Sequence, residues 1–473
     1  MIFSSLVFLC VFLPVVYLLY SVMPSLKLKN GLLILASLLF YAYGEPVYVL
    51  LMLFSTGLNY LCARLICLGR GKRAVLVINV IGNLGVLGVF KYTGFFIDSF
   101  NHIFHQNLPD PGIALPVGIS FFTFQALSYV IDVYQGKVQV QKNFWNVLLY
   151  ISFFPQLIAG PIVKYRDISQ AIESRRTDIR QASFGMRRFI CGLAKKVLIA
   201  NTMGKVADAV FTADVGCVNV VVAWIGAIAY LFQIYYDFSG YSDMAIGLGK
   251  LFGFQFRENF NYPYGAVNIQ DFWRKWHISL SGWFKEYLYI PLGGNRKGRA
   301  RTCINKLIVF FCTGLWHGAS WTFVLWGLYH GMFLLLEEYV PVIRKFPKII
   351  GHLYSMLVVC VGFVLFRADT ISQAGYMIKE MFTGFHFSAP AGSFAWQQVT
   401  PWFLTMLFAA VIGAAPMKGL ADKIRSGIYG NEVLSRKWSF VQNGLFILSY
   451  VLLLWCMIRL SGSTYNPFIY FRF

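Results

Sequence analysis

The stretch FFCTGLWHGASWTFVLWGLYHGMFLLL, residues 310–336, contains no Asp, Glu, Lys or Arg. Apolar runs longer than about 18 residues are typical of membrane-spanning helices, because charged side chains are costly in hydrocarbon. A Gly-Ala-Ser sequence at 318–320 interrupts the run. We therefore predict two adjoining helical segments at membrane depth, 304–316 and 319–340.

The same pattern recurs along most of the chain. Further apolar blocks cover 2–22, 31–44, 47–68, 75–99, 114–134, 144–162, 189–201, 218–237, 349–366, 401–416 and 440–460. Several are shorter than the ~20 residues that an upright helix needs, so we expect some to be tilted, re-entrant or interfacial. The sequence predicts an all-α polytopic membrane protein with about ten to twelve transmembrane helices, plus re-entrant and interfacial helices; the arrangement of these helices around a central funnel or tunnel is implied only by the family resemblance given below.

Composition agrees with a membrane protein. Of 473 residues, 58% are apolar and 13% are charged, against about 45–50% and roughly 25% in soluble domains. The net charge of +21 is explained mainly by basic cytoplasmic loops, with a smaller share for an anionic ligand or headgroup. Membrane lipid is therefore an expected partner, and nucleic acid is not.

Cysteine and histidine patterns give no support for a metal site. The nine cysteines contain no CxxC pair and lie mostly in apolar blocks, which is typical of small buried hydrophobic residues. The seven histidines show no HExxH spacing. We expect neither disulfides nor a bound metal.

Basic residues orient the predicted spans. The loops after the first and third spans carry Lys27, Lys29, Arg70, Lys72 and Arg73. The positive-inside rule makes both loops cytoplasmic and places the N-terminus outside. The loop 101–113 then falls outside, and it has no Lys or Arg. The polar stretches 164–196 and 254–301, with nine and eight basic residues, should face the cytoplasm.

Two segments place polar groups or helix breakers where lipid is expected. In FFPQLIAGPIVKYRD, 153–167, Pro155 and Gln156 precede a Gly-Pro pair, which predicts either a kink or a re-entrant segment that lines a substrate path. In YYDFSGYSDMAIGLGKLFGF, 235–254, a spacing of six puts Asp237 and Asp243 on different helix faces. With Ser239, they either tie neighbouring helices together or take part in catalysis.

The stretch 259–298 mixes aromatic and basic residues, a composition typical of the membrane interface. It is either a helix anchored at the headgroups or a basic floor for a phosphate-bearing donor, in which Arg274, Lys275 and Arg296 are the candidate ligands. His277 is either a hydrogen-bonded interface residue or a reactive one.

His317 is the strongest candidate for chemistry. It follows Trp316 and lies between Gly314 and Gly318, which would let a helix or a substrate approach closely. A lone buried histidine is more often structural, but its membrane depth, flanking glycines, nearby basic loops and the broken segment upstream favour function.

Taken together, these segments resemble the membrane-bound O-acyltransferase (MBOAT) family, in particular its bacterial alginate O-acetylase membrane-subunit branch. The matching motifs are SFFTFQALSYVIDVYQG (120–136), FFPQLIAGPI (153–162), YYDFSGYSDMAIGLGKLFGF (235–254), NFNYPY with DFWRKWHISLSGWFKEYLYIPLGGNR (259–296), GLWHGASWTFVLWGLYHG (314–331) and FVLFRA (363–368). A match in many segments, in order, is far more specific than a single WHG.

The resemblance implies a single transmembrane domain over 1–473, with N-terminal spans 1–113, a catalytic core 114–368 and C-terminal spans 369–473. It implies that His317 is the catalytic histidine and that His277 is linked to activity. We expect an O-acyltransferase of the bacterial cell membrane with no bound cofactor. Its acyl-CoA donor, acetyl-CoA, is cytoplasmic, and its acceptor is an extracytoplasmic partner protein or glycan.

Two alternatives stay open. Within the enzymes, the chain could be a D-alanyl transferase or a transferase of longer acyl groups for cell-wall polymers. Outside them, broken helices and intramembrane aspartates also suit a transporter. No inverted repeat is visible, however, and the histidine motifs argue against transport.

Overall fold

The computed structural model describes residues 1–69, 71–416 and 432–469. Within these ranges all regular elements are helices, and the short π and 3₁₀ segments are labelled η. The first half comprises η1 (Phe8–Phe12), α1 (Leu13–Val22), α2 (Leu26–Ala42), α3 (Tyr48–Cys67), α4 (Lys72–Phe104), α5 (Ile119–Tyr134), α6 (Phe144–Ser152), α7 (Phe154–Leu157), α8 (Tyr165–Ser174), α9 (Ile179–Ala194), η2 (Lys195–Ala200), α10 (Asn201–Phe211) and η3 (Val215–Cys217).

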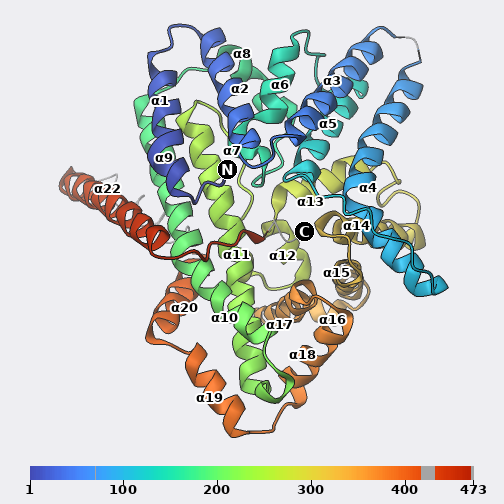
Figure 1. Cartoon of the computed structure of the whole chain (residues 1–473), viewed down its shortest axis with the longest axis vertical. Coiled ribbons are helices and arrows are strands. Elements are labelled where there is room, and N and C mark those ends of the chain that lie inside the picture. Colours follow the sequence, from blue (N-terminus) through green and yellow to red (C-terminus); the bar gives the residue numbers. More distant parts are fainter. Residues whose placement is uncertain (70, 417–431, 470–473) are drawn as a thin grey trace.

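The second half is also helical. It comprises α11 (Val220–Leu251), η4 (Pro263–Gly265), α12 (Ile269–Lys275), α13 (Ile278–Phe284), η5 (Lys285–Tyr289), α14 (Arg299–His317), α15 (Trp321–Tyr339), α16 (Pro341–Arg344), α17 (Lys348–Arg367), α18 (Ile371–Thr383), α19 (Ala389–Gln398), α20 (Pro401–Ala414) and α22 (Glu432–Ser461). Figure 1 shows α11 passing through the middle of the molecule, with α4 at one edge and α22 projecting from another.

Five described helices are long and apolar enough to cross a membrane: Tyr48–Cys67, Lys72–Phe104, Val220–Leu251, Lys348–Arg367 and Gly444–Ser461. A sixth is possible if α19 and α20, bent by 65° at their junction, form one broken span. The predicted all-α membrane fold is confirmed. These are the described helices of full spanning length; shorter apolar helices, Phe8–Val22 and Ile119–Tyr134, lie outside this set, so the number of ten to twelve spans stays a prediction.

The block 144–162 is not one straight helix. α6 ends at Ser152, Phe153 leaves the helical region of backbone space, and α7 restarts with Pro155 in its first turn. Residues 158–164 continue without regular structure, and all of 147–165 is buried. Irregular backbone at membrane depth is tolerated only when protein or a cavity surrounds it, and here protein surrounds it.

α9 and α11 lie in backbone contact. A methyl group on Gly192 would come within 2.5 Å of the Gly240 carbonyl oxygen, and one on Gly185 within 2.6 Å of the Gly247 carbonyl oxygen. Only residues without a side chain allow such an approach. Glycines spaced along both helices therefore set the position of α11 at the centre of the bundle.

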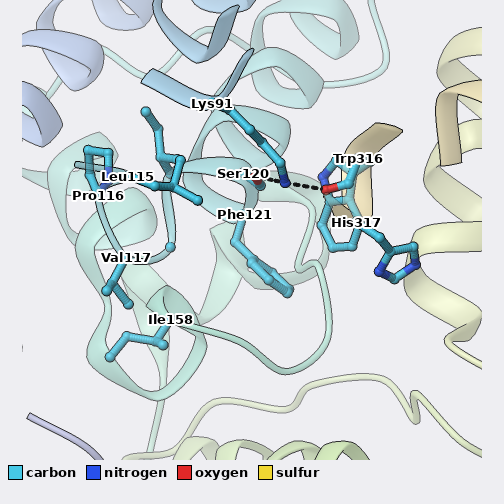
Figure 2. Close-up of a pocket in the computed structure, with 11 residues that line it drawn as sticks. Lys91, Leu115, Pro116, Val117, Ser120, Phe121, Ile158, Trp316 and His317 are labelled. Atoms are coloured by element: carbon cyan, nitrogen blue, oxygen red, sulfur yellow. Dashed lines mark hydrogen bonds between the residues drawn. The ribbon is translucent and has the colours of Figure 1, made fainter. Parts of the chain in front are cut away.

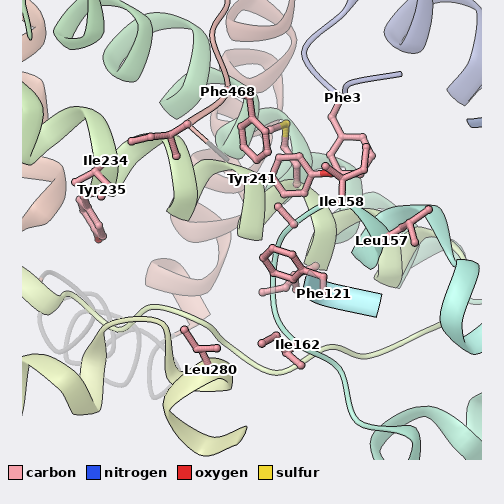
Figure 3. Close-up of a cluster of buried hydrophobic side chains, with 14 of the residues drawn as sticks. Phe3, Phe121, Leu157, Ile158, Ile162, Ile234, Tyr235, Tyr241, Leu280 and Phe468 are labelled. Carbon is pink, nitrogen blue, oxygen red and sulfur yellow. The ribbon is translucent and has the colours of Figure 1, made fainter. Parts of the chain in front are cut away.

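The core joins residues from both ends of the described chain. The Tyr241 ring, on α11, is stacked between Phe3 at 4.7 Å and Phe468 at 4.8 Å. Figure 3 shows these three rings side by side, next to Ile158 of the irregular segment 158–164. The Asn466 side-chain amide also donates to the Ser4 carbonyl oxygen, at 2.8 Å. The segment after α22 is thus part of the interior.

Candidate active site

His317 is the last residue of α14, at the turn that leads into α15. The turn is tight because a side chain on Gly314 or Gly318 would collide with Phe323 of α15. The Ser320 hydroxyl caps the next helix by accepting from the Thr322 backbone N–H. His317 therefore lies not inside a continuous helix but at a helix end, where a side chain can line a cavity.

The His317 side chain is 5% exposed and is surrounded by aromatic rings. Its ring centre is 5.0 Å from that of Trp316, 5.1 Å from that of Trp326 and 5.2 Å from that of Phe366. It lines a cavity of about 120 Å³ and a second, very small one of about 10 Å³, which Ile469 also lines. The imidazole thus borders two spaces.

His277 lies close to His317 although forty positions separate them in sequence. Their ring centres are 6.5 Å apart, and both rings contact Trp316. His277 is fully buried and precedes α13 in a left-handed backbone conformation, with φ of 42°. Non-glycine residues rarely adopt this conformation, and such strain is found where function or packing demands it.

Asn259 holds the His277 ring. Its side-chain oxygen lies 3.2 Å from His277 Nδ1 and also accepts from the Ser279 backbone N–H and hydroxyl. Because an oxygen faces Nδ1, this nitrogen carries the proton in the neutral ring. His277 Nε2 is buried and has no hydrogen-bond partner among the described residues. It is therefore left as a free acceptor.

The same asparagine connects three parts of the molecule. Its side-chain amide donates to the Ser242 hydroxyl of α11 at 3.1 Å and to the Gly160 carbonyl oxygen, in the irregular segment 158–164, at 3.4 Å. The sequence analysis did not single out Asn259, and no local pattern marks it. Its importance arises only from these tertiary contacts.

The larger cavity at His317 is bounded by α4, by residues 115–121 at the start of α5 and by Ile158. Figure 2 shows the Lys91 side chain reaching from α4 toward Ser120 and Trp316. Its ammonium donates to the Trp316 carbonyl oxygen at 2.5 Å and to the Ser120 hydroxyl at 3.3 Å. Lys91 was also missed from sequence, although a single lysine inside the apolar block 75–99 is a signal of function.

The polar residues of α11 tie helices together. Asp237 pairs with Lys196 of η2 at 2.6 Å and accepts from the Ile469 backbone N–H at 2.8 Å. Asp243 pairs with Arg188 and Lys195, at 2.8 and 2.6 Å. Both aspartates thereby hold α11 against the α9–η2 helix, one of the two roles that the sequence left open. The Ser239 hydroxyl is buried beside them, without a hydrogen-bond partner in the described parts of the chain.

The three candidate donor ligands differ in their surroundings. Arg274 and Arg296 are exposed. Lys275 is half-buried, and its ammonium binds the Asp271 carboxylate at 2.8 Å and the Gly265 carbonyl oxygen. Two of the three side chains are therefore available to an anion, and the third already has a carboxylate partner.

Of the remaining candidates, Trp316 contacts both histidines, whereas Pro155 and Gln156 lie in the broken segment after α6. Pro155 begins α7, and the Gln156 side-chain amide donates to the Tyr150 carbonyl oxygen at 2.6 Å. Trp316 lines both the His317 cavity and a larger apolar groove of about 700 Å³ between α4, α5 and α14. Over the described residues, no group of three His, Cys, Asp or Glu side chains is placed to hold a metal ion.

Comparison with known proteins agrees with this geometry. Residues 138–368 match the model of the MBOAT, membrane-bound O-acyltransferase, family. The probable alginate O-acetylase AlgI of Azotobacter vinelandii is 37% identical over the whole of both chains. The peptidoglycan O-acetyltransferase of Helicobacter pylori is 38% identical over 80% of both. The teichoic acid D-alanyltransferase of Bacillus subtilis is 26% identical, over 53% of this chain and 68% of its own length.

The names of these relatives share the transfer of a small acyl group, acetyl or D-alanyl. The two O-acetyltransferases match along most or all of the chain, well beyond the histidine motifs. Together with the helical membrane fold, this shows that the protein is a membrane O-acyltransferase and that it belongs to the MBOAT family, in the alginate O-acetylase-like branch.

Proposed function

We propose that this chain moves an acetyl group from cytoplasmic acetyl-CoA to an acceptor on the outer side of the bacterial cell membrane, in the O-acetylation of a polysaccharide. The observation that carries the proposal is the meeting of two buried histidines, His277 and His317, whose ring centres are 6.5 Å apart, with His317 lining a cavity. The names of the two O-acetyltransferase relatives support the acetyl group and the glycan.

In this proposal His317 is the general base. The acceptor hydroxyl oxygen attacks the thioester carbonyl carbon while the His317 imidazole takes the hydroxyl proton. The C–S bond then breaks, and the CoA thiolate leaves with that proton. A covalent acyl-His317 intermediate is the less favoured variant. General base catalysis contributes about 10²–10⁴-fold, so positioning in the cavity must supply much of the rest.

His277 is proposed to orient the reactants or relay a proton. Ring centres 6.5 Å apart suit a bridging hydroxyl or water better than a direct hydrogen bond. Since Asn259 holds the proton on Nδ1, the buried Nε2 is the nitrogen that can accept from such a bridge. The strained backbone at His277 fits a ring that is held in one orientation.

The donor is proposed to bind at the basic cytoplasmic stretches. Arg274 and Arg296 are exposed and can give charge-assisted hydrogen bonds to the CoA phosphates. Lys275 would contribute less, because its ammonium is paired with Asp271. The acceptor is proposed to be a separate extracytoplasmic partner protein, or the glycan itself.

One observation favours a second candidate, a transferase of longer acyl groups. The apolar groove of about 700 Å³ adjoins Trp316 and is lined by Phe95, Phe124 and Leu127 among others, so it suits a hydrocarbon chain. The cavity of about 120 Å³ at His317 suits acetyl or D-alanyl instead. A screen of purified protein with acetyl-CoA, hexanoyl-CoA and palmitoyl-CoA separates the candidates.

The test uses proteoliposomes that contain the full chain, with alginate oligosaccharides added as the hydroxyl acceptor, and measures release of the CoA thiol from acetyl-CoA. We expect steady release by the wild type, loss of release by His317→Ala and a strong reduction by His277→Ala. His102→Ala, which changes an exposed histidine at the end of α4, is the matched control and should be unaffected. Full activity in His317→Ala would refute the proposed role of this residue.

The acceptor needs a separate measurement. Mass spectrometry of cell-wall and exported glycans, in cells carrying the wild type or His317→Ala, should show acetyl esters that only the wild type adds. Acetylation of a glycan at full rate by the purified chain alone would remove the partner protein from the proposal.

A further inference from the structure

Lys91 is a buried cation without a buried anion. Its side chain is 9% exposed, and it lies in a helix long and apolar enough to cross a membrane. None of the ion pairs among the described residues includes it. An isolated charge in a low-dielectric site is costly, and such residues usually mark function.

Lys91 lies next to His317, so its charge can act on a group that binds at this histidine. Both side chains line the same cavity of about 120 Å³, and the Lys91 ammonium is anchored to the backbone carbonyl of the residue that precedes His317. Two of its three N–H groups donate hydrogen bonds, to the Trp316 carbonyl oxygen and the Ser120 hydroxyl. The third can donate to a group that binds in the cavity.

A negative charge is favoured in this cavity for a second reason. Residues 118–121, the first turn of α5, form part of its wall. The N-terminal end of a helix carries a partial positive charge. The ammonium and the helix end therefore both stabilise a negative charge in the cavity. Acyl transfer would develop such a charge on the carbonyl oxygen.

We propose that Lys91 is a catalytic residue of the acyl transfer: its ammonium donates a hydrogen bond to the acyl carbonyl oxygen as this oxygen becomes negative. The inference rests on the proposed function. When the acceptor hydroxyl adds to the thioester carbon, the electron pair of the C=O bond moves to the oxygen, where Lys91 binds it. When the C–S bond breaks, that pair reforms the C=O bond, so Lys91 gives up no proton.

A structural role is the competing explanation. A cation at the C-terminal end of a helix stabilises the helix, and the Lys91 contact to Trp316 does satisfy a terminal carbonyl of α14. The neighbouring Tyr92 does the same without charge, since its hydroxyl donates to the Leu315 carbonyl oxygen at 2.7 Å. Tyr92→Phe is therefore the matched control for the capping contact.

The experiment compares Lys91→Gln, Lys91→Arg, Tyr92→Phe and wild type in proteoliposomes with acetyl-CoA. Lys91→Gln keeps a donor for the Trp316 carbonyl but removes the charge. We expect its maximal rate of thiol release to fall about 10²–10³-fold, the usual effect of losing one oxyanion donor. The half-saturating acetyl-CoA concentration should stay near that of wild type. Lys91→Arg should recover part of the rate, and Tyr92→Phe should match wild type.

Thermal unfolding in detergent checks that each variant folds, with Lys91→Met as a second neutral variant should Lys91→Gln not fold. Wild-type rates in a folded neutral variant, with His317→Ala inactive, would overturn the inference and leave the proposed function standing. A loss that appears only as a raised half-saturating concentration would also overturn it. No thiol release by wild type would overturn both.

Discussion

Two regions of the molecule bury charge in opposite ways. On α11, Asp237 and Asp243 each meet a cation at 2.6 Å, and the Asp237–Lys196 pair has side chains only 2% and 4% exposed. On α4, Lys91 is also buried, at 9% exposed, but among the described residues its ammonium donates to a carbonyl and a hydroxyl and to no carboxylate, beside a cavity. Paired charge fixes helices, whereas unpaired charge at a cavity is available for chemistry. The following predictions test this division.

The largest effect on stability is expected from Lys196→Met. Removing one partner of a buried ion pair leaves the other uncompensated and costs about 3–5 kcal/mol. Thermal unfolding in detergent should show the loss, with Lys379→Met, on an exposed face of α18, as the control. The double variant Lys196→Met/Asp237→Asn should recover part of the stability. If the Lys196→Met protein were as stable as the control, the claim that the paired charges on α11 hold the helices together would be wrong.

The second effect is expected from Asn259→Ala. It removes the acceptor for His277 Nδ1 and for the Ser279 backbone N–H, and buried groups left without a partner cost about 1–3 kcal/mol. Thiol release should fall because the His277 ring is no longer held in one orientation. Asn261→Ala, two residues away and exposed, is the control. An unchanged rate in a folded Asn259→Ala protein would show that this ring need not be held.

A smaller effect is expected from Glu286→Gln, in a half-exposed cluster at the start of η5. Burial raises the pKa of the Glu286 carboxyl. The hydrogen bonds and charges of Lys164 and Arg166, at 2.8 and 2.6 Å, outweigh burial, so that its pKa lies below the ordinary value of 4.5. A carboxyl with a depressed pKa adds stability above its unfolded-state pKa and loses it as the pH falls through the folded-state value.

Glu286→Gln should therefore lower the unfolding temperature at neutral pH and have little effect on it at acidic pH. Because 30% of the side chain is exposed, the contribution should be about 1 kcal/mol or less. Unfolding curves recorded from neutral to acidic pH measure it. An effect that grows on acidification would contradict the sign of the pKa shift.

The smallest effects are expected at the proposed donor surface. Single Arg274→Ala and Arg296→Ala changes should raise the half-saturating acetyl-CoA concentration by about fivefold or less, since exposed charges contribute up to ~1 kcal/mol. Added salt should reduce the difference from wild type. Lys275→Ala should change it least, because Asp271 already binds this ammonium. If Lys275→Ala raised the half-saturating acetyl-CoA concentration more than Arg274→Ala or Arg296→Ala, then Lys275, and not the arginines, would be the main ligand of the donor phosphates.

Much of the fold was predictable because it depends on local signals. The apolar blocks gave the all-α membrane class, and Pro155 with the Gly-Pro pair indicated the break that separates α6 from α7. The number of spans does not follow from the apolar blocks alone, because several of them fold into short or broken helices inside the bundle. Composition alone does not separate residues that face lipid from residues that face protein.

The site was predictable only in part. The motifs around His277 and His317 pointed to both residues through family resemblance, but no periodicity brings together positions so far apart. Lys91 and Asn259 were missed for the same reason: their roles depend on contacts with Trp316, and with Ser242 and Gly160, that only the folded chain creates. The end of α14 at His317 was expected to within one residue, from the Gly-Ala-Ser sequence at 318–320; the close contact with Phe323 at this turn was not, because it is a tertiary effect.

The ring of Tyr241 has a consequence for how the protein is made. Phe3 and Phe468 both stack on it, at 4.7 and 4.8 Å, so the last aromatic contact of the central helix forms only after the end of the described chain has been synthesised. Residues 466–469 also bond to Ser4 and Asp237. A chain cut off before this segment would therefore keep an incomplete interior, however many of its spans are already in place.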